Sequence, residues 1–164
     1  MDRIADLFAD FGAEFGLSRP AGKCLGTIWR ADTTPCADDL TASLGLSRSN
    51  VSTALKELRA WSLISVVRHP GDRKEYFAAP DDPWELVLLL VAARRQRVIV
   101  PALERLLRIE ARRADVRALP LHDVVTQLDR WLSAMGHLSP SAFARAIAVP
   151  IDDNHRKKKK KKKN

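Results

Sequence analysis

Residues 37–79 hold two helical patterns, a turn and two β-type runs in a fixed order, which constrains the fold more than any other part of the chain. The first helical pattern places Leu40 and Leu44 one turn apart. Gly45 follows where the chain must turn sharply, a position suited to positive φ. After the second helical pattern, β-type runs lie on both sides of Pro70-Gly71. The sequence therefore predicts a helix-turn-helix followed by a β-hairpin wing.

The second helix of this motif separates its apolar and polar side chains onto different faces. Its apolar residues follow helical spacing toward a core: Val51, Ala54, Leu55 and Leu58. The exposed face carries short hydrogen-bonding groups and cations, which we take as DNA-binding residues: Ser47, Arg48, Ser49, Asn50, Ser52, Thr53 and Lys56. Ser47 is also suited to cap the helix. This pattern predicts a recognition helix that enters the major groove of double-stranded DNA.

The predicted hairpin carries positive charge at its tip. Pro70 and Gly71 fit the two central positions of a type II turn. Arg68, Arg73 and Lys74 lie close to this turn and are further candidate DNA-binding residues. Cations held on a hairpin suit phosphates or a narrow minor groove. The alternative is a solvated turn with ordinary surface charge.

Several residues of this motif also carry a family resemblance. They lie at the turn, on the second helix, after it and in the hairpin: Gly45, Ser47, Val51, Ser52, Ala54, Leu55, Leu58, Trp61, Gly71, Asp72 and Arg73. With these residues, the chain resembles the GbsR-like branch of the MarR superfamily of winged-helix transcriptional regulators, most specifically over residues 22–79. It departs at Ser62, where such sequences often carry glycine. The resemblance implies a repressor that binds an inverted repeat in DNA as a homodimer.

Apolar stripes on helical patterns near both ends of the chain predict a dimerisation module. The candidate dimerisation residues are Leu7, Phe8, Phe11, Phe15, Val125, Leu128, Trp131, Leu132 and Met135. The alternatives are packing of the first stripe on the winged domain and of the second stripe on helices of the same chain. MarR-type regulators dimerise through terminal helices, so the resemblance favours contact with a second chain.

A long helix is predicted to follow the wing. Asp82, Pro83 and Glu85 form a strong helix start, and Pro101 is expected to kink the helix further along. Arginines precede and follow the expected kink, among them Arg94, Arg95 and Arg97. They form either a second DNA-facing patch or a solvated helix face paired with nearby acidic residues.

The predicted fold is mainly α with a small β-wing, and it has a winged helix-turn-helix domain plus terminal helices that form a dimerisation module. Residues 1–17 form an N-terminal helix, 18–80 the winged domain, 81–149 the kinked helix and C-terminal helices, and 150–164 a disordered lysine-rich tail. Eight of the 28 basic residues lie at positions 156–163, so the remaining 20 equal the 20 acidic residues. A basic DNA-binding surface must therefore be local rather than a property of the whole chain.

Enzymatic chemistry has little support in the sequence, and we predict no catalytic residues, no cofactor and no metal site. HExxH, GxSxG and Gly-rich phosphate-binding patterns are absent. Cys24 and Cys36 lack a CxxC or CxC partner. Two alternatives to a plain regulator stay open: a winged-helix sensor gated by metal or thiol oxidation, and a winged-helix module for protein contacts.

Location and effector are the last sequence-level expectations. No apolar run is long enough to cross a membrane and no signal-peptide pattern is present, so we expect a cytoplasmic protein. A small-molecule effector, if one exists, is expected in a cavity between the winged domain and the dimerisation helices. The four tryptophans are expected to pack in cores rather than to form an aromatic cage.

Overall fold

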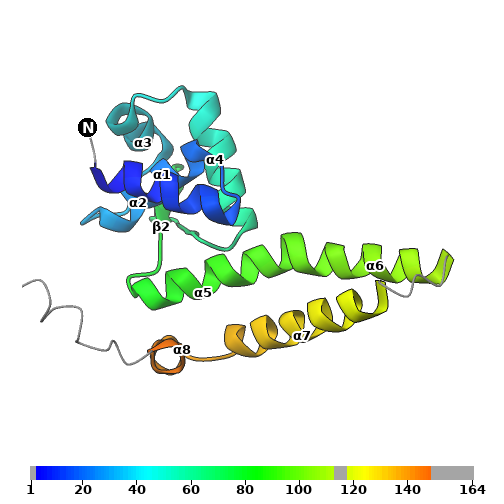
Figure 1. Ribbon diagram of the computed structural model, residues 1–164. Helices are drawn as coiled ribbons and strands as arrows, with labels where there is room; N and C mark the ends of the chain where they lie inside the picture. The colour runs from blue at the N-terminus through cyan, green and yellow to red at the C-terminus, as the bar shows by residue number, and fades with distance from the viewer. Residues whose placement is uncertain (1–2, 113–117, 149–164) are drawn as a thin grey trace, which may run out of the picture.

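The computed structural model describes residues 3–112 and 118–148, which form a head of short elements above a long helical arm (Figure 1). The head comprises α1 (Arg3–Phe15), α2 (Arg19–Arg30), α3 (Ala37–Leu44), α4 (Arg48–Ala60), β1 (Ser65–Val67) and β2 (Tyr76–Ala78). The arm comprises α5 (Pro83–Arg94), the π-helical turn η1 (Arg95–Ile99), α6 (Val100–Arg112), α7 (Ala118–Gly136) and α8 (Pro140–Ile147). The predicted winged-helix fold class is confirmed. The predicted tail at 150–164 lies outside the described residues.

The turn between α3 and α4 has the predicted geometry. Gly45 adopts a left-handed conformation with φ of 62°, and its N–H donates to the Thr41 carbonyl oxygen at 3.1 Å. Ser47 then caps α4, since its hydroxyl oxygen accepts a hydrogen bond from the Asn50 N–H at 3.2 Å. These two caps set the direction in which α4 leaves the turn.

The end of α4 is closed by a Schellman motif that contains a serine in place of glycine. Ser62 has φ of 58° and donates its N–H to the Arg59 carbonyl oxygen at 3.0 Å. The Leu63 N–H donates to the Leu58 carbonyl oxygen at 3.0 Å, and both leucine side chains are fully buried. A residue with a side chain thus occupies a left-handed position, and buried leucines on both sides hold it there.

The wing is an antiparallel hairpin with Ser65 opposite Ala78, Val66 opposite Phe77 and Val67 opposite Tyr76. At its tip the Asp72 N–H donates to the His69 carbonyl oxygen at 3.1 Å, and Gly71 has φ of 83°. The type II turn predicted at Pro70-Gly71 is confirmed. The residues before α3 also contact β2, because the Phe77 N–H donates to the Pro35 carbonyl oxygen at 3.0 Å.

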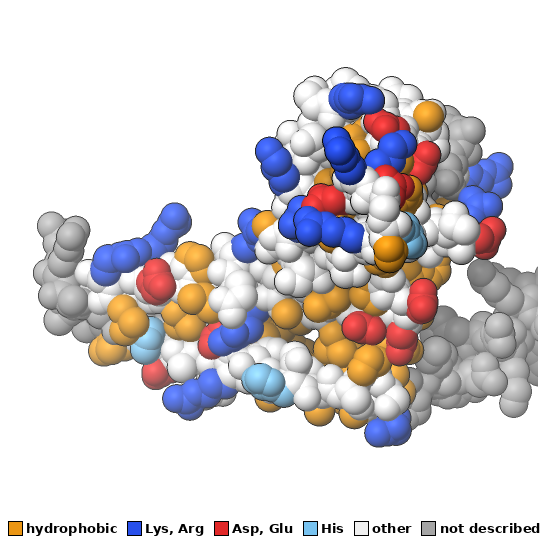
Figure 2. Space-filling model, turned by 180° about the vertical axis from the view of Figure 1, so that it is seen from behind, with side chains coloured by type: hydrophobic (Ala, Val, Ile, Leu, Met, Phe, Trp, Pro, Cys, Tyr) orange, Lys and Arg blue, Asp and Glu red, His pale blue; other side chains and the backbone are white. Residues whose placement is uncertain are grey.

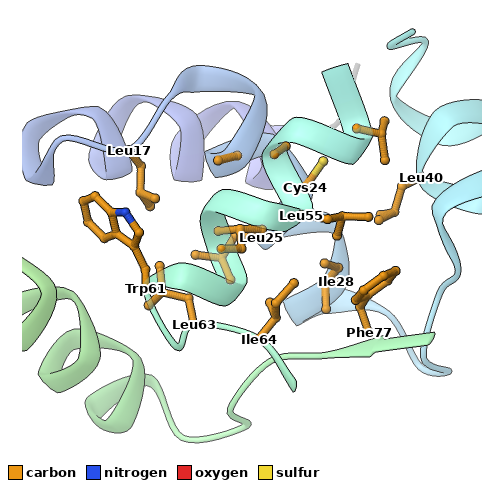
Figure 3. Packing of buried hydrophobic residues seen from close by; sticks show 14 of the residues in the cluster. Leu17, Cys24, Leu25, Ile28, Leu40, Leu55, Trp61, Leu63, Ile64 and Phe77 are labelled. Atoms are coloured by element: carbon orange, nitrogen blue, oxygen red, sulfur yellow. The ribbon is translucent and has the colours of Figure 1, made fainter. Parts of the chain in front are cut away.

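A single hydrophobic cluster joins the head to the first helix of the arm. Leu25 of α2, Leu55 of α4 and Phe77 of β2 lie in this cluster (Figure 3). Leu86 and Leu90 of α5 belong to it as well. The orientation of α5 therefore depends on the same core that holds the recognition helix.

Small residues bring α1 and α2 into close contact. Ala5, Ala9 and Gly12 are the buried residues of α1, and they face a helix in which Gly22 and Gly26 are buried. The predicted apolar stripe of α1 is only partly buried. Phe8 and Phe15 are half-buried against the core of the head, whereas Leu7 and Phe11 are 57% and 48% exposed.

The long helix of the arm accommodates Pro101 by widening one turn. The Val100 N–H bonds to the Arg95 carbonyl oxygen, a π-helical step, and α6 continues beyond the proline. The π-helical turn thus lies just before the proline at which a kink is expected. In Figure 1, α5, η1 and α6 follow one another as one long helix, and α7 runs back beside it.

Substitution of Gly22 by alanine should destabilise the head. A Cβ atom at Gly22 would lie 2.6 Å from both the Ala9 Cα and the Phe8 carbonyl oxygen, so two backbones would have to separate. We expect the free energy of unfolding to fall by about 1–3 kcal/mol, measured by urea denaturation. Gly136→Ala is the matched control, because nothing lies within 4 Å of its Cβ position. Equal loss of stability in both variants would contradict this packing.

Candidate nucleic-acid interface

The exposed face of α4 carries every recognition-helix residue that the sequence singled out. Ser47, Arg48, Ser49, Asn50, Ser52, Thr53 and Lys56 are all exposed. The opposite face is buried, with Val51 and Leu58 fully so. Lys and Arg side chains gather over the head and are intermixed with acidic side chains (Figure 2). The structure therefore presents small polar groups and cations on one helix face, which suits contact with a groove of DNA.

Asp38 connects α4 to the wing. Its Oδ1 atom lies 2.8 Å from Nη2 of Arg48 on α4, and its Oδ2 atom lies 3.6 Å from Nζ of Lys74 in the wing. The side chain of Arg48 remains 81% exposed in this pair. Sequence analysis placed Arg48 and Lys74 in the interface and did not identify Asp38 as their common partner.

Glu75 makes a second connection of the same kind. Its Oε1 atom lies 2.9 Å from Nη2 of Arg68 in the wing, and its Oε2 atom lies 3.5 Å from Nη1 of Arg59 on α4. The hydrogen bond from Arg68 lowers the pKa of the Glu75 carboxyl below its usual value. We call Asp38 and Glu75 the bridging carboxylates, because each joins a cation of α4 to a cation of the wing.

Asp72 organises the tip of the wing. It accepts the Lys74 N–H at 2.9 Å and the Tyr76 hydroxyl at 2.6 Å. The hydrogen bond to Asp72 raises the pKa of Tyr76 to about 12, and the same bond lowers the pKa of the Asp72 carboxyl. The ring of His69 contacts the Tyr76 ring edge-on at 4.8 Å. The family resemblance included Asp72, but its hydrogen bonds became visible only in the folded hairpin.

Arg73 is the cation of the wing with the most freedom to contact a ligand. Its side chain is exposed, and no acidic partner of Arg73 occurs among residues 3–112 and 118–148. Arg68 and Lys74 differ, since each is held by a bridging carboxylate.

The arginines at the end of α5 and in η1 hold elements together, which neither sequence interpretation expected. Arg94 donates to the Phe15 carbonyl oxygen at 3.2 Å, and the Arg97 guanidinium lies 4.6 Å from the centre of the Trp61 ring. Both contacts join the arm to the head. Arg94 and Arg97 thus contact the head while both residues remain exposed.

Arg95 connects η1 to α7 through a largely buried ion pair. Its Nη2 donates to Asp129 Oδ2 at 2.9 Å, and its Nε lies 2.8 Å from Oδ1. The Nε–H donates instead to the Asp129 backbone carbonyl oxygen at 3.3 Å. Oδ1 of Asp129 is therefore attracted by the guanidinium charge but accepts no hydrogen bond. This pair attaches the π-helical turn to the returning helix.

The apolar residues predicted along α7 lie partly on a half-buried face and partly on an exposed face of the helix. Val125, Leu132 and Met135 are half-buried against the arm. The exposed side chains include Leu121, Val124, Leu128 and Trp131, which are 52%, 64%, 41% and 55% exposed. Their spacing of three, four and three residues is that of a helix-pairing seam. The seam is thus only partly buried within the chain, and the expectation that Trp131 packs in a core is wrong for this chain.

An open apolar cavity of about 370 Å³ lies between α1, α2 and α5. Its lining includes Leu7, Phe8 and Phe11 of α1, Trp29 of α2 and Leu86 of α5. Phe8 packs on Trp29 with ring centres 5.4 Å apart. The cavity lies between the head and the arm, where an effector site was expected, and its volume is in the range of small-molecule sites.

Both cysteines are buried, which limits access to their thiols. Cys24 is fully buried, and this burial raises the pKa of its thiol to about 11, so the thiol stays protonated at neutral pH. Cys36 is also buried, at the start of α3. Within residues 3–112 and 118–148, no cluster of His, Cys, Asp and Glu is suited to a metal ion. In the same residues, no helix is both long and apolar enough to span a bilayer.

Comparison with known proteins finds one family model and solved structures that resemble this chain. Residues 15–75 match the model of the MarR family. The solved structure of a transcriptional regulator has a TM-score of 0.65 to this chain at 19% identity, covering 81% of this chain and 92% of its own, which shows a common fold. A transcriptional regulator from Thermotoga maritima has a TM-score of 0.42 at 14% identity, covering 82% of this chain and 90% of its own. The search of curated proteins finds no match.

Removal of the Asp72 carboxylate should lower the pKa of Tyr76 from about 12 toward its usual value near 10. Tyr76 is the single tyrosine of the chain, so phenolate absorbance reports it alone. In the wild type this contact stabilises the fold fully at pH values below the pKa that Tyr76 has in the unfolded chain. The stabilisation is lost as pH rises through about 12, the pKa of Tyr76 in the folded protein. We expect Tyr76 to titrate at lower pH in Asp72→Asn and at the wild-type pH in Asp81→Asn. Identical curves for both variants and the wild type would exclude the hydrogen bond.

Proposed function

We propose that this chain, whose residues 15–75 match the MarR family, is a non-enzymatic winged-helix regulator of the GbsR-like branch that represses transcription. It binds an inverted repeat in double-stranded DNA as a homodimer. In each protomer α4 enters the major groove, and the wing contacts the backbone or the minor groove. The observation that carries this proposal is the exposed polar face of α4 beside the cationic wing.

The residues of α4 divide into two proposed roles. Arg48 and Asn50 lie in its first turn and are assigned to base edges, because guanidinium and amide groups pair with guanine and adenine in the major groove. Arg73 of the wing is assigned to phosphate. The hairpin holds its backbone, so the freedom lost on docking is that of the side chain alone.

Two apolar surfaces support the homodimer. The exposed seam of α7 and the partly exposed stripe of α1 both carry large apolar side chains that this chain leaves uncovered. Pairing of such surfaces by a two-fold axis would place two recognition helices about one DNA turn apart, or a multiple of it. A dimer of this form matches an inverted repeat.

The apolar cavity supports an effector-binding role for the same protein. A molecule bound there would contact α1 and α2 of the head and α5 of the arm. The lining residues are apolar and include no charged side chain, which favours a hydrophobic molecule. A bound molecule would favour one angle between the head and the arm. In a homodimer, that angle would set the distance between the two recognition helices.

Arg48→Ala or Asn50→Ala should weaken binding to a selected operator by about 1–3 kcal/mol and relax its sequence preference. Arg73→Ala should instead weaken binding to operator and random DNA alike, because phosphate contacts carry no sequence information. Fluorescence anisotropy on both duplexes separates the two roles. If Arg48→Ala and Asn50→Ala weaken both duplexes equally, the assignment to base edges is wrong.

Leu128→Glu should weaken the dimer by placing an unpaired carboxylate in the α7 seam. We expect the dimer dissociation constant to rise about 100-fold, measured by sedimentation or light scattering. Leu119→Glu is the matched control, since it makes the same change at an exposed leucine on the opposite side of α7. A wild-type protein that stays monomeric at micromolar concentration would contradict the homodimer.

A further inference from the structure

Three cations of the proposed DNA interface, Arg48, Arg68 and Lys74, are held by acidic residues of the same chain. Asp38 holds Arg48 of α4 and Lys74 of the wing, and Glu75 holds Arg59 and Arg68 in the same manner. Each bridging carboxylate therefore lies between the two elements that are proposed to contact DNA. A negative charge in such a place opposes binding to phosphate, so its presence calls for a physical reason.

We propose that Asp38 is a positioning residue that raises the selectivity of this protein for its operator over random DNA. It orients Arg48 toward base edges and holds Arg48 and Lys74 away from nonspecific phosphate contacts. This inference rests on the proposed function and adds to it a selectivity-determining residue outside the recognition helix.

The geometry leaves Arg48 able to read a base while Asp38 holds it. The contact to Asp38 uses one terminal nitrogen, Nη2, and a guanidinium has five N–H donors in a planar fork. The side chain is 81% exposed, so its remaining donors face solvent. An arginine held in this way loses less rotamer freedom when it forms a bidentate contact with guanine.

The position of Arg48 on α4 gives Asp38 a second effect. Arg48 is the first residue of α4, where the partial positive charge of the helix terminus disfavours a cation. Asp38 lies in the first turn of α3, where a carboxylate is favoured. The Asp38 carboxylate is thus favoured at the N-terminus of α3 and offsets the unfavourable cation at the N-terminus of α4. It also links α3, α4 and the wing at one point.

The effect on random DNA has the opposite sign to the effect on the operator. Nonspecific binding depends almost wholly on phosphate neutralisation, so a carboxylate beside two cations weakens it. Operator binding also gains from base contacts made by an oriented Arg48. Loss of the Asp38 charge should therefore help random DNA and bring no comparable gain on the operator.

Asp38 can be changed without loss of the fold. Its side chain is 49% exposed, and exposed ion pairs contribute about 0–1 kcal/mol to stability. Its neighbour Asp39 differs, because the Asp39 carboxylate accepts the Cys36 N–H at 2.9 Å at the start of α3. Asp38→Asn thus removes a charge from the interface and leaves this cap in place.

The test compares the wild-type protein with Asp38→Asn, Asp38→Glu and Asp123→Asn. The last variant removes an 80% exposed carboxylate from the arm and controls for net charge. The probes are a duplex selected by the wild type from a random pool and a duplex of scrambled sequence, titrated at several salt concentrations. Circular dichroism confirms that each variant is folded.

For Asp38→Asn we expect affinity for the scrambled duplex to rise roughly threefold to tenfold. The slope of the logarithm of this affinity against the logarithm of salt concentration should steepen by about 1–2, because one or two cations then reach phosphates. The operator preference should fall by about fivefold or more. Asp38→Glu should restore most of the preference. A merely structural role for Asp38 would lower both affinities instead.

The outcomes separate this inference from the proposed function. If the wild type selects a sequence but Asp38→Asn leaves preference and salt dependence unchanged, the role of Asp38 is wrong and the regulator stands. If Asp123→Asn has the same effect as Asp38→Asn, net charge alone explains it and the positioning role is overturned. A wild-type protein that binds DNA without any sequence selection would overturn the proposed function and this inference together.

Discussion

Burial of the apolar face of α4 is the interaction on which the rest of this structure depends. Leu55 and Leu58 pack against α2 and β2, and the same cluster takes in Leu86 and Leu90 of α5. Because one face of α4 is fully committed to this core, the opposite face with Arg48 and its polar neighbours must remain in solvent. Burial thus determines which side chains are free to meet DNA, and it also determines where the arm begins.

Contacts between the head and the arm give the protein a way to connect distant surfaces. Arg97 lies over Trp61 at the end of α4, Arg94 bonds to the end of α1, and Arg95 attaches the π-helical turn to α7. A change in the α7 seam therefore has a path of direct contacts to the recognition helix. The apolar cavity lies beside this path, between α1, α2 and α5.

Features governed by local rules were predictable, and features governed by long-range contact were not. The Gly45 turn, the Ser47 cap, the start at Asp82 and the type II turn at the wing tip each depend on a few adjacent residues. Sequence analysis did not predict the bridging carboxylates, because Asp38 and Lys74 come into contact only when the wing folds back beside α3. The roles of Arg94, Arg95 and Arg97 escaped it for the same reason.

The sequence by itself determined the order of elements, the two faces of α4 and the charge of the wing, since periodicity and turn chemistry act within a few residues. Only the tertiary structure decided which face of α1 packs, because the close approach of Ala9 to Gly22 depends on two helices crossing. It also decided how the α7 seam divides between the arm and solvent. The spacing of apolar residues predicts that a helix face will be buried. Which helix covers that face depends on the geometry of the whole chain.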